Sequence, residues 1–199
     1  MPSMFHKKFN LSYLHLQKTG GWHVSHILKQ LGFQNINFNI CGGHVGVKDA
    51  PKNSFTFGFV RHPVAWYKSL FNYFSNVNWI HRAHILKTDN INEFIELIQK
   101  HRVYQYQHLV TRFYNLNADD ECNFIGRYEL LHHDLKRVLY LHAQQLDVEC
   151  SYIDQIIRTN QDKLINKSIA IHNDQFSEDS IQYIYESCKQ IFDRFKYDI

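Results

Sequence analysis

The segment from Leu11 to Leu31 constrains the fold more than any other part of this 199-residue chain. Apolar residues dominate its first positions, Lys18-Thr19-Gly20-Gly21 interrupts them, and apolar residues then recur at helical spacing. This order predicts a buried strand, a tight loop and an amphipathic helix. A glycine-rich loop at a helix N-terminus binds anions, because its N–H groups and the helix dipole favour negative charge. We therefore expect a phosphate site with Lys18 as cation and Thr19 as hydroxyl donor, although an ordinary strand–turn–helix connection has the same pattern.

Composition narrows the classes of protein to which the chain can belong. Its length and its 44% hydrophobic content suit one folded domain covering residues 1–199. A net charge of only +3 argues against nucleic-acid binding by bulk electrostatics. The four cysteines are widely spaced, which predicts reduced thiols and a cytoplasmic protein. No secretion signal is recognisable at the N-terminus, and no apolar run is long enough to span a bilayer, so we expect no membrane segment.

Strand and helix signals alternate along the chain. Residues 11–16, 55–60 and 123–126 read as core strands, with a short extra strand expected between Phe33 and Ile40. Helices are expected after Pro63, after an Asn90 cap, over 104–114, over 131–139, and as one long helix after Ser177. The alternation predicts an α/β fold with a central parallel sheet flanked by helices.

Arg61 and Ser69 form the second pattern with chemical meaning. Arg61 follows the strand 55–60, at the end where ligands bind in open α/β sheets, and its guanidinium can bind phosphate with two parallel hydrogen bonds. Ser69 comes eight residues later, about two turns along the expected helix. The two side chains could therefore face one anion, although an edge arginine and a surface serine would also fit.

Together these motifs resemble those of sulfotransferases that use 3′-phosphoadenosine 5′-phosphosulfate (PAPS). Lys18-Thr19-Gly20-Gly21 resembles their 5′-phosphosulfate loop, and Arg61 with Ser69 resembles their 3′-phosphate motif in spacing and order. Gly43-His44-Val45 resembles the segment with the catalytic base in the carbohydrate-modifying, Golgi-type 2-O-sulfotransferase branch. Gly126-Arg127-Tyr128-Glu129 resembles a segment whose tyrosine lies near the adenine, and 166–168 and 193–197 resemble the closing pattern of the family.

The resemblance implies a P-loop-NTPase-like sulfotransferase fold and in-line transfer of a sulfuryl group to an alcohol. PAPS would be the co-substrate, 3′-phosphoadenosine 5′-phosphate (PAP) the product, and no metal would be needed. His44 would accept the hydroxyl proton, and Lys18 would stabilise charge on the leaving oxygen. The residues implied in nucleotide binding are Lys18, Thr19, Gly20, Gly21, Trp22, His23, Arg61, Ser69, Arg127 and Tyr128. Trp22 and His23 replace the small hydroxyl residues that are usual in the family.

The acceptor and two other functions remain open at this stage. A stretch with little helical periodicity could hold a saccharide hydroxyl acceptor or be a solvated loop; its candidate residues are Trp79, His81, Arg82, His84 and Lys87. A nucleotide kinase of related fold would need a standard P-loop, which the chain lacks. A module that binds PAP without turnover would explain Trp22 and His23. The histidine pairs at chelating spacing lack a second matching pair, so we expect no metal site.

Overall fold

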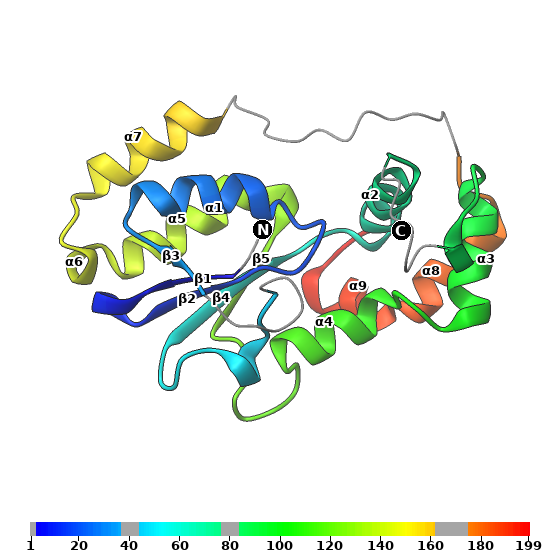
Figure 1. Cartoon of the computed structure of the whole chain (residues 1–199), viewed down its shortest axis with the longest axis horizontal. Helices are drawn as coiled ribbons and strands as arrows, with labels where there is room; N and C mark the ends of the chain where they lie inside the picture. The colour runs from blue at the N-terminus through cyan, green and yellow to red at the C-terminus, as the bar shows by residue number, and fades with distance from the viewer. Residues whose placement is uncertain (1–2, 37–43, 77–83, 162–174) are drawn as a thin grey trace. The chain divides into compact units, whose positions relative to one another are not determined.

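The computed structural model describes residues 3–36, 44–76, 84–161 and 175–199. The chain divides into two compact units, each assembled from two segments. The first unit contains residues 1–61 and 110–166, and the second contains residues 62–109 and 167–199. Figure 1 traces the chain by colour from the N-terminus to the C-terminus.

A five-stranded mixed sheet forms the centre of the first unit, in the order β3-β1-β2-β4-β5. Its strands are β1 (Met4–His6), β2 (Leu11–Leu14), β3 (Gln34–Asn35), β4 (Phe55–Val60) and β5 (Phe124–Arg127). β2, β4 and β5 run parallel, whereas β1 pairs antiparallel with β2 and with β3. The α/β class is therefore confirmed, and the sheet is parallel only in its β2–β4–β5 part.

One face of this sheet carries the main core. Tyr13 of β2 and Phe57 and Phe59 of β4 are completely buried there, because alternate residues of a strand point to the same face. Figure 1 shows α1 (Gly21–Gln30) and α5 (Leu131–Leu141) beside the sheet, and apolar residues of α1, α5 and α7 (Cys150–Gln161) join the same core cluster. The short α6 (Ala143–Leu146) connects α5 to α7.

The C-terminal end of α4 (Tyr106–Tyr114) packs against β4. The Tyr114 hydroxyl donates to the Phe59 carbonyl at 2.9 Å and accepts from the Phe59 N–H at 3.0 Å. Gly58 allows this contact, because a β-carbon built at residue 58 would lie 2.5 Å from Tyr114 Cε1. The tyrosine therefore depends on a glycine in the middle of a buried strand.

The second unit is helical, with the elements α2 (Pro63–Asn76), η4 (His84–Leu86), α3 (Ile91–His101), the first part of α4, α8 (Glu178–Ser187) and α9 (Lys189–Phe195). The expected caps are confirmed: Asn90 accepts from the N–H groups of Asn92 and Glu93, and Ser177 accepts from Ser180. The expected single final helix is wrong, because Cys188 leaves helical geometry with φ −120° and ψ 15°. It separates α8 from α9.

Short elements account for most other differences from the sequence-based expectations. β1 was not expected, and β3 covers only Gln34–Asn35 of the strand expected between residues 33 and 40; residues 37–40 lie outside the described part. Among its described residues, the first unit also contains the 3₁₀ helices η1 (Lys7–Phe9), η3 (Val47–Asp49) and η5 (Tyr128–Leu130). Within the described ranges, no helix has the length and apolar character needed to cross a membrane.

Candidate anion-binding site

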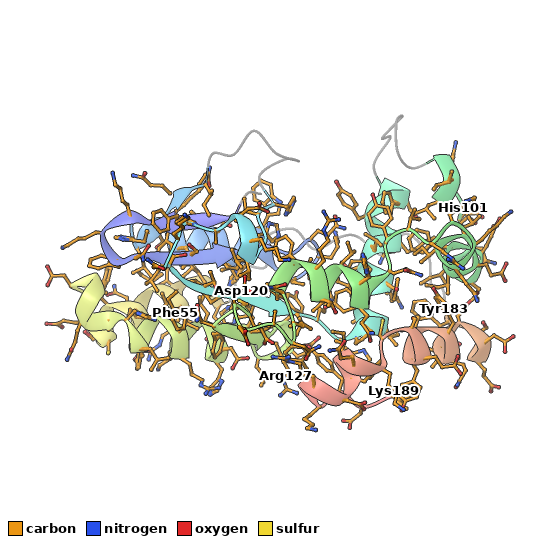
Figure 2. The ribbon with its side chains drawn as sticks, turned by 90° about the horizontal axis from the view of Figure 1, so that it is seen from below. Phe55, His101, Asp120, Arg127, Tyr183 and Lys189 are labelled. Atoms are coloured by element: carbon orange, nitrogen blue, oxygen red, sulfur yellow. The ribbon has the colours of Figure 1, made fainter. Side chains whose placement is uncertain are left out.

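The parallel strands bring the predicted motifs to one edge of the sheet. Leu14 of β2 pairs with Gly58 of β4, and Val60 of β4 pairs with Arg127 of β5. The loop that follows β2, Arg61 after β4 and Tyr128 after β5 therefore leave the sheet at the same edge. Figure 2 labels Arg127 at this edge and Phe55 at the opposite end of the parallel strands. The residues predicted to bind a ligand therefore follow the same ends of these parallel strands.

The loop between β2 and α1 has unusual backbone geometry. Lys18 has a left-handed conformation with φ +65°, and Gly20, the N-cap of α1, has φ +81°. A left-handed conformation is uncommon in a residue with a side chain and is found often at functional sites. Gly20 has no side chain that could cap α1, and the His23 N–H donates to the Gly20 carbonyl at 3.0 Å. An anion could take the place of the missing cap.

Thr19 differs from its predicted role. Its side chain is completely buried, and its hydroxyl donates to the Leu16 carbonyl at 2.6 Å. The hydroxyl hydrogen that we expected to reach a ligand is therefore used inside the loop. In this structure, Thr19 stabilises the turn that precedes α1.

Two cations converge at this loop. Arg61 Nη1 donates to the Lys18 carbonyl at 3.4 Å, so the guanidinium lies against the loop backbone. Burial and the charge of Arg61 together lower the pKa of the Lys18 amine to about 8. Two partly buried positive charges repel each other, and a bound anion would relieve that repulsion. The electrostatics of the site therefore favour a ligand with at least one negative charge.

The Tyr128 ring contacts both Arg61 and Gly20. The Arg61 guanidinium lies 4.5 Å from the centre of the ring, a cation–π distance. A β-carbon at residue 20 would lie 2.8 Å from Tyr128 Cε2, so the ring also packs on Gly20. The neighbouring Arg127 N–H donates to Asp134 Oδ2 at 2.9 Å, which fixes the strand end. The structure thus brings Tyr128 and Arg127 to the site, while their contacts with a nucleotide stay predictions.

A hydrogen bond to the backbone sets the tautomer of His44. The His44 Nδ1 lies 2.8 Å from the His15 carbonyl oxygen. A carbonyl can only accept a hydrogen bond, so Nδ1 carries the proton and Nε2 of the neutral ring has a lone pair. Burial lowers the pKa of the His44 imidazole from its ordinary value, an effect that the bond to the His15 carbonyl partly opposes. The ring is therefore neutral near pH 7 and can accept a proton at Nε2.

Two histidines that the sequence did not single out, His15 and His132, contact predicted site residues. The His15 ring centre lies 4.8 Å from that of His44. His23 in the first turn of α1 lies with Nε2 2.7 Å from Nε2 of His132 in α5. No local pattern links residues 23 and 132, and His15 looks like a single polar residue in an apolar strand. The only signal for His15 in the sequence was its position three residues before Lys18.

The first turn of α1 presents Trp22 and His23 differently. Trp22 is 50% exposed, whereas His23 is 8% exposed and held by the contact with His132. Trp22 is therefore accessible to a ligand or a partner molecule. His23 is committed to a contact between α1 and α5.

The remaining predicted residues lie elsewhere. Ser69 is buried in α2, in the second unit, so its partnership with Arg61 stays a prediction from spacing. Among the predicted acceptor residues, Trp79, His81 and Arg82 lie outside the described residues, His84 begins η4, and Lys87 is exposed. In the described ranges, no group of three or more His, Cys, Asp or Glu side chains is placed to hold a metal ion.

Comparison of the sequence with protein-family models and with curated proteins finds no match. The resemblance to sulfotransferases therefore stays a prediction from the sequence motifs. Lys18, Gly20, Arg61 and Tyr128 come from three separate segments and meet at one sheet edge.

Proposed function

We propose that this protein is a sulfotransferase that moves a sulfuryl group from PAPS to a hydroxyl group, with a carbohydrate as the acceptor. The observation that carries the proposal is the convergence of Lys18 and Arg61 beside the N-terminus of α1, where the N-cap residue is a glycine. A cofactor with phosphate and phosphosulfate groups supplies the negative charge that this arrangement favours. The finer fold assignment, a P-loop-like sulfotransferase fold, is part of the same proposal and is supported by the parallel β2–β4–β5 core.

The residues fit the 5′ end of PAPS better than they fit an uncharged ligand. The first amides of α1 would donate to its 5′-phosphosulfate oxygens, and Gly20 lets the backbone turn toward them with φ +81°. Lys18 would lie beside the bridging oxygen and stabilise the charge that develops on it. The family motif assigns Arg61 and Ser69 to the 3′-phosphate and Tyr128 to the adenine.

His44 would act on the acceptor. Its Nε2 would take the proton of the acceptor hydroxyl while the hydroxyl oxygen attacks sulfur. The bond between sulfur and the bridging oxygen breaks as the new oxygen–sulfur bond forms, and PAP leaves with the electron pair. The hydrogen bond from Nδ1 to the His15 carbonyl keeps the lone pair on Nε2 and stabilises the ring after protonation.

A transfer assay tests the proposal directly. Wild-type protein is incubated with ³⁵S-labelled PAPS and a panel of neutral and anionic saccharides, phenols and steroid alcohols, and labelled products are separated by charge. We expect label on one or more saccharides and none on the other acceptors. If calorimetry shows PAP binding but no acceptor is labelled, the proposed sulfotransferase activity is rejected.

That second outcome describes an alternative that one observation favours. His23 is held by His132 instead of replacing the missing hydroxyl donors, which leaves the loop with fewer side chains for a phosphosulfate. A protein that binds PAP or PAPS without turnover would tolerate this loss. The same assay separates the two functions, because a binding module would take up the nucleotide and release PAPS unchanged.

A further inference from the structure

The His15 imidazole occupies the space that a side chain at residue 21 would need. His15 directly follows β2 and its side chain is 5% exposed. A β-carbon built at Gly21 would lie 1.8 Å from His15 Nε2 and 2.0 Å from its Cδ2. Such atoms normally pack at about 3.5–4.0 Å, so residue 21 has no room for a side chain while the imidazole stays in place.

Positions 20 and 21 therefore require glycine for different reasons. Gly20 has φ +81°, a conformation that disfavours any side chain. Gly21 is the first residue of α1, and the obstacle there is the His15 ring alone among the contacts that a β-carbon would meet first. The second glycine of the loop thus fits a histidine of the same loop.

The same residue also holds His44 from two sides. The His15 carbonyl accepts the His44 Nδ1 hydrogen bond at 2.8 Å, and the two rings lie 4.8 Å apart at 45°. The His15 ring in turn stacks on Tyr13 of the core, with ring centres 6.1 Å apart and an angle of 21°. The buried Tyr13, His15 and the candidate base thus form a continuous series of contacts.

We propose that His15 is a positioning residue, whose imidazole sets the place of His44 relative to the N-terminus of α1. This inference rests on the proposed function, in which His44 is the base and the N-terminus of α1 holds the 5′ end of PAPS. His15 acts through His44 and Gly21 and does not touch the reacting atoms. Its carbonyl selects the tautomer of His44, and its ring fixes the location of that tautomer.

The first experiment measures the coupling between residues 15 and 21 and needs no enzymatic activity. Gly21→Ala should lower the melting temperature by roughly 3–10 °C, because the added methyl group overlaps the ring. In a His15→Ala background the same substitution should be neutral or stabilising, because the methyl group enters the vacated space and alanine favours a helix. Gly20→Ala is the matched control and should destabilise in both backgrounds, owing to its positive φ and to Tyr128.

The second experiment follows His44 itself. NMR titration of the imidazole, assigned by comparison with His44→Gln, should show a higher His44 pKa in His15→Ala than in wild type, because water enters the space beside the ring. His15→Phe keeps a planar ring and should leave the His44 pKa near the wild-type value. In the transfer assay, His15→Ala should lower kcat about 10- to 100-fold with a much smaller change in PAP affinity, as expected for a misplaced base.

The outcomes separate this inference from the proposed function. Additive effects of His15→Ala and Gly21→Ala on melting temperature would overturn the placement of the ring. Strong coupling with an unchanged His44 pKa would show that His15 only fills space, and would overturn the positioning role. Wild-type protein that transfers no sulfuryl group would reject the proposed function, while the coupling and the titration would still decide whether His15 positions His44.

Discussion

At the scale of single residues, Lys18 combines three features that bear on its protonation. It has a left-handed backbone, it is partly buried, and its carbonyl accepts a hydrogen bond from Arg61. Burial first, and the Arg61 charge second, lower the pKa of its amine to about 8. Its protonation therefore changes within a range of pH that binding experiments can reach.

We predict that PAP binding is accompanied by proton uptake near pH 8. A bound anion raises the pKa of Lys18 from about 8, so part of the population takes up a proton, and affinity falls as pH rises above that value. Calorimetry in two buffers of different ionisation enthalpy measures the uptake. Lys18→Arg keeps the charge without titrating and should abolish the uptake; equal uptake in this variant would assign the proton to another group.

The same pKa shift of Lys18 predicts how the stability of the protein without ligand changes with pH. The unfolded chain binds a proton at Lys18 up to about pH 10.5, whereas the folded chain releases it near pH 8. Between these values the unfolded state binds more protons, so the contribution of Lys18 to the free energy of unfolding rises with pH. Urea unfolding at pH 7.5 and pH 9.5 should show this increase in wild type relative to Lys18→Met. The prediction fails if the difference between the two proteins does not change with pH.

For Arg61, we expect removal of the guanidinium to weaken PAP more than adenosine 5′-phosphate. A charge-assisted hydrogen bond contributes about 1.5–3 kcal/mol, so Arg61→Ala should weaken PAP binding roughly 10- to 150-fold. Arg61→Lys, which keeps the charge but loses the planar fork, should lie between. Equal losses for both nucleotides would place Arg61 at the 5′ end, beside the Lys18 carbonyl that it contacts.

For His44, we expect substitution to separate binding from transfer. His44→Gln should retain PAP affinity and lose about 10²- to 10⁴-fold in kcat, the usual effect of removing a general base. His26→Ala, an exposed histidine of α1, serves as the control and should leave both constants unchanged. Wild-type turnover in His44→Gln would direct attention to His23 or His62 as the base.

At the scale of elements, the sequence predicts best where a long apolar strand meets a clear helix start. β2 with α1, β4 with α2, and β5 with α5 all appear at the expected places, and their parallel pairing explains why Lys18, Arg61 and Tyr128 meet. β1 and β3 contain three and two residues, too few to show a period. Contacts such as His23 with His132 are made across the fold, so no local pattern could predict them.

Capping gives a prediction at this scale. The Asn90 side chain accepts from the N–H groups of Asn92 at 2.8 Å and Glu93 at 3.3 Å, at the start of α3. Asn90→Ala should lower stability by about 1 kcal/mol, which chemical denaturation can measure. Asn90→Asp keeps an acceptor and should retain most of the stability. If Asn90→Ala and Asn90→Asp lower the free energy of unfolding equally, the side-chain cap does not stabilise α3.

At the scale of the whole molecule, both units are discontinuous in sequence. The first unit needs residues 1–61 together with 110–166. Phe57 and Phe59 of β4 are completely buried, and the apolar cluster around them includes residues of α5 and α7. We therefore expect a fragment of residues 1–109 to lack cooperative unfolding by circular dichroism, unlike the full chain. A folded fragment with a sharp transition would contradict this dependence on the later segment.

The discontinuity also affects how the protein is made. A ribosome adds roughly 5–20 residues per second, so β4 emerges several seconds before α5 and α7, which complete its cover. During that interval Phe57 and Phe59 of β4 cannot pack against α5 and α7. A nascent chain in this state is a substrate for chaperones that bind exposed apolar segments. Codon choices that slow translation between residues 62 and 130 would prolong the exposure and lower the yield of folded protein.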